Sequence, residues 1–400
     1  MIYTENNGNI SLYWITFTFT IKEALMCHNP GSEKGLILTN AKEDYIMKRS
    51  ELQNLRKYAG DLSGIYGMQD ITYNEGKAKG MRAIQLKNGQ GLEATLLPDR
   101  CLDIPYFSYK GINLGLVTKV GLSAPTYFTE DGVRGFLKQF NAGLLTTCGL
   151  TYSGAPSEID GREYGLHGVI GNTPCTSVNK EEVYEDDAIS LQVSGDVQEA
   201  CVFSEYVAMH RKMKMETESN IFHIIDTIEN RDFEPVPLMN LYHINFGYPL
   251  LDASCRVYFS TEKVEPRDEI ALQGMSRYSF IEEPEIAKDE ECYIHTGGKG
   301  SQFAMVHNPK LGIAAVVHYD IDDLPLFNEW KCMKSGDYAL GLEPSAAGFW
   351  GLKYAKEHNL PQYLQSGETK AYHIRIEILD DSKAIQSYVS KCKESKIASK

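Results

Sequence analysis

An alternation of apolar and polar residues with a period of two runs through most of this 400-residue chain. Residues 371–379 show it most clearly, since isoleucines at every second position would share one face and polar residues the other. Similar runs occupy residues 81–86, 189–193, 221–228, 256–260 and 313–319. This period is typical of strands with one buried face. Many short strands without long helices between them predict an all-β protein, a large antiparallel sandwich with a few short helices.

Helical patterns are confined to the two ends of the chain. Residues 41–59 predict a helix, because Asn40 and Glu43 stand at capping-box spacing and Gly60 would stop it. Residues 12–21 are β-branched and aromatic without a basic segment before them, which predicts a strand rather than a signal peptide or membrane span. The lysine-rich end predicts a solvated closing helix, with a partner-binding basic tail as the alternative. We therefore expect an N-terminal extension of strand plus helix (1–75) packed on the main domain, one β-sandwich domain (76–380) and a C-terminal helix or tail (381–400).

Charge and cysteine usage narrow the partners. The formal net charge is −14, which repels nucleic-acid backbones and anionic membrane surfaces and leaves a small molecule as the expected partner. The nine cysteines are scattered and form no C-x-x-C pair, so we expect neither a disulfide framework nor a structural zinc site. Scattered thiols of this kind favour a reducing cytoplasm.

Nucleotide-binding motifs are present only in fragments. Gly89, Gly91 and Ala94 give G-x-G-x-x-A, but the run that follows reaches Pro98 too soon for a crossover helix, so a hairpin turn is expected. Gly297 to Gly300 resemble a P-loop in composition alone, because no Ser or Thr follows Lys299. We expect no cofactor.

Three short polar islands interrupt the strand pattern and each carries one titratable side chain. They are G-L-H-G around His167, N-L-Y-H-I-N-F-G-Y-P around His243 and L-G-L-E-P around Glu343. Two imidazoles and a carboxylate suffice to move protons on and off a neutral substrate. Each also has an ordinary structural explanation: a turn histidine, a satisfied core histidine and a strand-end carboxylate. Tyr242, Phe246 and Tyr248 would offer flat apolar faces to a sugar ring, and Asn245 would offer a donor and an acceptor to its hydroxyls. These neighbours favour a pocket floor for the His243 island.

In these islands the sequence resembles the aldose 1-epimerase, or galactose mutarotase-like, family. The motifs L-H-G, H-x-N-F and L-E-P occur in the family's order over roughly residues 80–380, and D-R-C-L-D-I (99–104) and T-C-G-L (147–150) resemble a divergent bacterial subgroup. The resemblance implies a galactose mutarotase-like β-supersandwich with a pocket on its concave sheet. It implies that His243 is the general acid at the ring oxygen, that Glu343 is the general base at the anomeric hydroxyl, and that His167 holds and polarises the sugar.

The sequence also departs from ordinary members of that family. The family's N-R-I segment is replaced here by a region containing T-T-C-G-L (146–150), and its hydroxyl-binding acid has no clear counterpart. Asn245, Arg100 and Lys331 are the candidates for substrate binding. Arg100 and Lys331 would favour an acidic or phosphorylated sugar if they reach the pocket, and would otherwise form framework ion pairs.

We expect a cytoplasmic, cofactor-independent aldose 1-epimerase acting in carbohydrate metabolism. A non-catalytic carbohydrate-binding or sensing protein is the main alternative. A polysaccharide lyase or hydrolase on a similar sandwich is a third possibility, although a hydrolase would require a second suitably placed carboxylate. For the acid–base pair we expect pKa values close to those in solution, with a histidine raised from its reference near 6.5 and a glutamate ionised from near 4.3.

Overall fold

The computed structural model describes residues 5–6, 9–10, 49–185, 188–217, 219–392 and 396–397. The chain divides into two compact units, residues 1–44 and 45–400. The described part of the first unit is the antiparallel pair β1 (Glu5–Asn6) and β2 (Asn9–Ile10). The strand predicted at 12–21 lies outside the described residues, and the predicted domain boundaries stay predictions.

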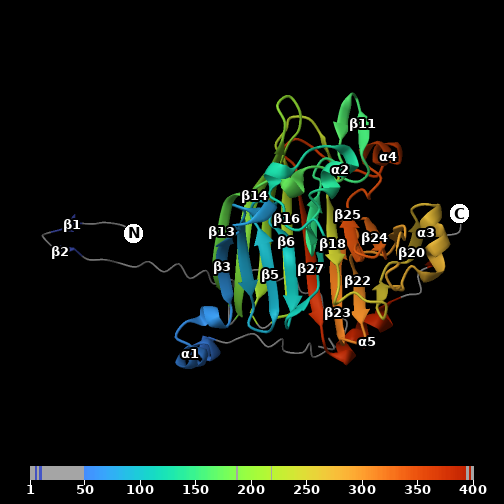
Figure 1. The fold of residues 1–400 in the computed structure, drawn as a ribbon. Coiled ribbons are helices and arrows are strands. Elements are labelled where there is room, and N and C mark those ends of the chain that lie inside the picture. Colours follow the sequence, from blue (N-terminus) through green and yellow to red (C-terminus); the bar gives the residue numbers. More distant parts are fainter. Residues whose placement is uncertain are drawn as a thin grey trace, which may run out of the picture. The chain divides into compact units, whose positions relative to one another are not determined.

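The second unit is built on two large sheets, which confirms the predicted all-β class (Figure 1). The first is 12-stranded and antiparallel except where β28 joins it. Its strands run in the order β28 (Lys396–Ile397), β20 (Lys263–Pro266), β21 (Glu291–Thr296), β24 (Leu326–Cys332), β25 (Ala339–Ser345), β18 (Leu241–Phe246), β10 (Leu145–Cys148), β6 (Asp103–Tyr109), β5 (Leu92–Leu97), β4 (Arg82–Lys87) and β3 (Gly67–Thr72), with β7 (Ile112–Asn113) paired to β6.

The second sheet is eight-stranded and antiparallel. Its order is β13 (Thr176–Glu185), β14 (Ala188–Ala200), β15 (Tyr206–Glu216), β16 (Ile221–Asn230), β27 (Thr369–Leu379), β23 (Ile313–Asp320), β22 (Ser301–Asn308) and β19 (Arg256–Phe259). Two-stranded pieces complete the unit: β8 (Leu116–Val117) with β9 (Ala142–Gly143), β11 (Ser157–Ile159) with β12 (Arg162–Tyr164), and β17 (Val236–Leu238) with β26 (Gln362–Leu364).

The main core lies between the two sheets, as the alternation predicts. Ile374, Ile376 and Ile378 of β27 belong to one buried cluster together with Tyr242 and Ile244 of β18. Burial of such side chains contributes on the order of 1.5–3 kcal/mol each. The alternate residues of β18, among them the candidate His243, therefore face away from this core.

The helices are short, and none that the structure describes is long and apolar enough to cross a membrane. They are α1 (Arg49–Tyr58), α2 (Gly132–Leu137), α3 (Glu269–Gly274), α4 (Leu352–Glu357) and α5 (Ser382–Lys391). The first falls within the helix predicted at 41–59, whose capping residues lie outside the described residues. The last forms where a closing helix is predicted, and the Asp381 side chain caps it at the Ala384 amide. The fragment at Gly89 and Gly91 is the hairpin turn between β4 and β5, as expected.

Candidate active site

Strand register brings His243 and Glu343 together although 100 residues separate them. In the pairing of β18 with β25, Leu241 lies opposite Ser345 and Asn245 opposite Gly341, which sets His243 opposite Glu343. Side chains directly opposite in an antiparallel pair share a face and lie close together. On the flanking strands, Thr146 of β10 pairs with His243, and Asn328 of β24 pairs with Glu343. Four polar residues on four neighbouring strands therefore form one row across the sheet: Thr146, His243, Glu343 and Asn328.

The central two form a close pair. His243 Nδ1 lies 3.2 Å from Glu343 Oε1, and both residues are buried. Neither atom has a hydrogen-bond partner among the described residues, so their approach has the distance of a hydrogen bond without its alignment. Gly341 makes room for the carboxylate, because a Cβ at that position would collide with Glu343 Oε1. Buried polar atoms without partners are rare in folded proteins, and a catalytic role is one of the explanations for them.

His167 reaches the pair from a loop between β12 and the 3-10 turn η4 (Ile170–Asn172). Its backbone adopts a φ of 63°, and the following Gly168 packs so closely against the Tyr152 carbonyl that no Cβ would fit. The His167 ring stands edge-on to that of His243, with centroids 5.5 Å apart. Its Nδ1 is buried and has no partner in the described part of the chain. The three predicted titratable residues therefore converge.

Aromatic rings line the same place. The centroids of Phe140 and Trp330 lie 5.3 and 5.4 Å from that of His243, and Trp330 Nε1 donates to Glu290. Tyr242 and Phe246, which the sequence suggested as sugar-facing rings, instead point into the core.

Trp330 and Asn328 were missed in the sequence. Both lie on β24 in alternation, facing Gly341 and Glu343. Asn328 is fully buried, and neither its Nδ2 nor its Oδ1 has a partner among the described residues. Their spacing of two, matched to that of Gly341 and Glu343, is the signal that could have identified them.

Burial sets the charge state of the site, and it corrects the expected pKa values. Removal from water lowers the pKa of His243 to about 4, with a smaller opposing effect of Asn245. Burial, reinforced by the neighbouring His243, lowers the pKa of His167 to about 3. Burial also raises the pKa of Glu343 well above its ordinary value, as does the nearby Glu290, while Arg267 opposes the shift. Burial therefore shifts both imidazoles toward their neutral form and the Glu343 carboxyl toward its protonated form.

The three predicted substrate-binding residues differ in position. Asn245 is buried beside the pair, where its Nδ2 donates to the His243 carbonyl and its Oδ1 lacks a partner among the described residues. Arg100 is held by the Ser123 carbonyl, 2.8 Å from its Nη1, in the loop that precedes α2. Lys331 is next to Trp330 on β24 and so faces the other side of the sheet, where its Nζ lies 3.2 Å from Glu282. The structure brings Asn245, and neither cation, to the pair.

A buried ionic network lies directly behind the site. Arg211 of β15 binds Asp226 through two hydrogen bonds of 2.8 and 2.7 Å, and Asp226 accepts a third from the Tyr242 hydroxyl. Arg211 also donates to the Thr147 hydroxyl at 2.6 Å, and Thr147 donates to Asp103. Thr147 and Tyr242 are paired residues adjacent to Thr146 and His243. The D-R-C-L-D-I and T-T-C-G-L segments therefore join the site strands to the second sheet.

No three His, Cys, Asp or Glu side chains of the described residues converge closely enough to hold a metal ion.

A model of the family described as "Domain of unknown function (DUF4432)" matches residues 78–378. No curated protein matches the sequence.

Solved structures share the fold. A protein described as a "putative aldose 1-epimerase" from Klebsiella pneumoniae is 23% identical, with a TM-score of 0.78 over 83% of this chain and 89% of that one. A galactose mutarotase-like protein from Clostridium acetobutylicum is 14% identical (TM-score 0.58; 80% and 100% covered). A galactose 1-epimerase from Lactobacillus acidophilus is 11% identical (TM-score 0.51; 78% and 99% covered). The predicted galactose mutarotase-like β-supersandwich is thereby confirmed as the fold.

Proposed function

Since this chain belongs to the family described as a domain of unknown function (DUF4432), whose name assigns no chemistry, we propose its activity from the site itself. The protein is an aldose 1-epimerase that interconverts the anomers of a sugar without a cofactor. The observation that carries this proposal is the buried His243–Glu343 pair, whose reactive atoms are 3.2 Å apart. Anomer exchange needs one proton donor and one acceptor on the same substrate, and a pair of this kind supplies both.

The reaction balances with these two groups alone. One member protonates the ring oxygen while the other takes the proton from the anomeric hydroxyl, so the C1–O5 bond breaks and a C1 carbonyl forms. Rotation about C1–C2 and the reverse proton transfers close the ring with the opposite configuration. Each well-placed group contributes a factor on the order of 10²–10⁴ in rate.

The pair carries one exchangeable proton in either charge distribution. The family resemblance implies that His243 starts as the acid and Glu343 as the base. Burial favours the opposite placement, with the proton on Glu343 and a neutral His243. In the ionic form of the pair His243 is protonated and Glu343 is a carboxylate; in the neutral form the proton is on Glu343. Ring opening that starts from the ionic form ends in the neutral form, and ring closure restores the ionic form. The resting site therefore matches the charge state expected for the open-chain intermediate, and hydroxyls of a bound sugar would stabilise the ionic form.

The surrounding residues fit a neutral sugar. Trp330 and Phe140 offer aromatic faces to its C–H groups, and Asn328 and Asn245 offer unpaired buried amide atoms to its hydroxyls. His167 would contact the same oxygens from the loop side. Because Lys331 faces away and Arg100 is bound to Ser123, we assign a neutral rather than a phosphorylated aldose.

Polarimetry and saturation-transfer NMR test this proposal directly. The purified chain is expected to accelerate interconversion of at least one neutral aldose, such as glucose, galactose, mannose or fucose, above the buffer rate. Calorimetric binding of a sugar without acceleration would replace the enzyme with the carbohydrate-binding alternative.

A further inference from the structure

A second hollow lies on the same sheet as the candidate active site, at the end formed by β3 to β6. It has a volume of about 570 Å³, within the range of small-molecule sites. Residues of the main core alternate with its floor residues along β4 and β5, so its floor faces away from the core, as His243 does. Nothing in the proposed chemistry uses it.

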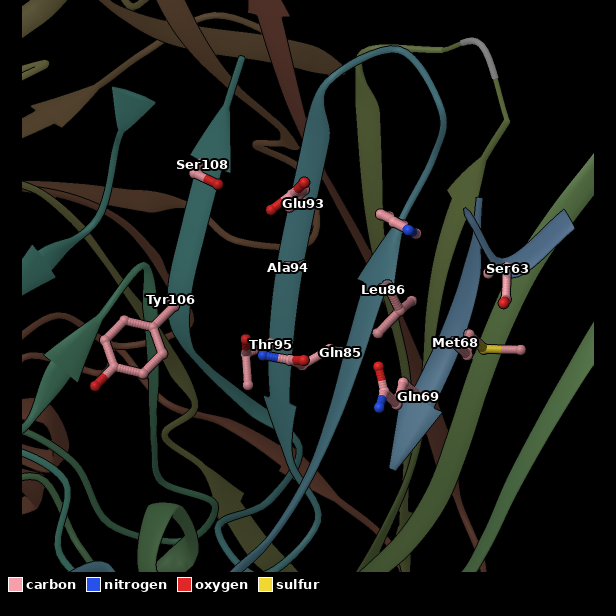
Figure 2. Close-up of a pocket in the computed structure, with 12 residues that line it drawn as sticks. Ser63, Met68, Gln69, Gln85, Leu86, Glu93, Ala94, Thr95, Tyr106 and Ser108 are labelled. Carbon is pink, nitrogen blue, oxygen red and sulfur yellow. The ribbon is translucent and has the colours of Figure 1, made fainter. Parts of the chain in front are cut away.

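The floor is a polar row built by register. Gln69, Gln85, Thr95 and Tyr106 lie opposite one another on four consecutive strands. Figure 2 shows Thr95 and Gln85 side by side at the centre, with Tyr106 on one flank and Gln69 on the other. Because neighbouring strands are roughly 4.8 Å apart, the row spans roughly 14 Å, longer than one pyranose ring.

The row has free hydrogen-bonding capacity. Among the described residues, no side-chain hydrogen bond joins the Gln69 or Gln85 amides, the Thr95 hydroxyl or the Tyr106 hydroxyl to another part of the chain. Thr95 is only 5% exposed, whereas Tyr106 is 40% exposed. Amides and hydroxyls that both donate and accept, beside an exposed aromatic ring, are the groups that recognise a polyol.

Charge favours the same class of ligand. Lys87 and Glu93 are the charged residues that line the hollow, and they lie opposite each other in the β4–β5 register. The lining is therefore neutral in sum within a chain of net charge −14. A phosphorylated ligand or a nucleic acid would need an excess of cations here.

We propose that this hollow is a second carbohydrate-binding site, which takes a neutral oligosaccharide segment along the Gln69–Tyr106 row. It acts in binding only, and it does not depend on turnover at His243. Hydroxyls pair with the two glutamines and Thr95, and one ring lies against Tyr106.

Calorimetry and saturation-transfer difference NMR with maltotriose, cellotriose and triacetylchitotriose test the assignment on the full chain. At least one trisaccharide is expected to bind, and Tyr106→Ala and Gln85→Ala should each weaken it at least tenfold while anomer interconversion of monosaccharides is unchanged. Tyr363→Ala is the matched control, because Tyr363 is 43% exposed and lies on β26 outside the hollow. Failure of all three sugars to bind, or binding that survives both hollow variants, would overturn the proposal. Binding lost in Glu343→Gln but kept in Tyr106→Ala would assign the ligand to the first site instead.

Discussion

The Arg211 guanidinium donates to the Thr147 hydroxyl across the interface of the two sheets, at a distance of 2.6 Å. Both partners are buried, and Arg211 is bound to Asp226 at the same time. The cation thus connects β15 and β16 to β10, the strand that pairs with β18 beside His243. A buried charge in this position makes the geometry of the site dependent on the interior of the sandwich.

We predict that Arg211→Met strongly destabilises the protein. Removing the cation leaves Asp226 and Asp103 buried without their partner, which costs on the order of 3–5 kcal/mol. Urea unfolding measures the change. Arg162→Met is the matched control, because its ion pair with Glu205 is partly exposed and should contribute about 1 kcal/mol or less. Equal losses in the two variants would show that the buried network does not support the fold.

His243→Asn and Glu343→Gln should each lower anomer interconversion by at least about 100-fold, because each removes one half of the proton exchange. The double variant should be little worse than either single variant, since the two groups act as a unit. Polarimetry measures the rates, and circular dichroism checks folding. His210→Asn is the control, because this exposed histidine lies outside the site in a pair with Asp196. Additive losses would mean that the residues act independently.

On the acid side, the interconversion rate should fall only at low pH. In the neutral pair His243 is the acceptor, so acid inactivates the site only where His243 becomes protonated, at about pH 4. At higher pH the rate should hold until Glu343 loses its proton, well above its ordinary pKa. The measurement is the buffer-corrected interconversion rate from pH 3 to 8. An acid limb near 6.5 would instead indicate a solvent-like histidine.

Gly341→Ala should impair activity more than stability. The added Cβ would collide with Glu343 Oε1 and crowd the Trp330 side chain, so the carboxylate must turn away from His243. We expect a loss of at least about tenfold in rate, with the protein still folded by circular dichroism. Gly64→Ala is the control, because open space surrounds that position. Unchanged activity in Gly341→Ala would show that the carboxylate has another productive position.

The alternation of the strands predicted the all-β class. The family resemblance carried by the three islands implied the supersandwich fold and the joint site of His167, His243 and Glu343. The sequence could not predict which face of the sheet Lys331 occupies. A shift of one residue in register moves a side chain to the other face, and only the observed pairing of β24 with β25 fixes that register. Trp330 and Asn328 were missed for the same reason.

The pKa values of His243 and Glu343 could not be predicted from the sequence, for a different reason. They depend on how much water the fold removes from each group, and a linear motif carries no measure of that burial.

The single proton that His243 and Glu343 carry between them is returned to the pair at the end of every turnover. The pair is then unchanged, so, like any catalyst, it accelerates the two directions of the exchange by the same factor. Adding more protein would then shorten the time needed to reach equilibrium and leave the final proportion of the two sugar forms untouched. Any net flux through such a site must be drawn by whatever consumes one form downstream.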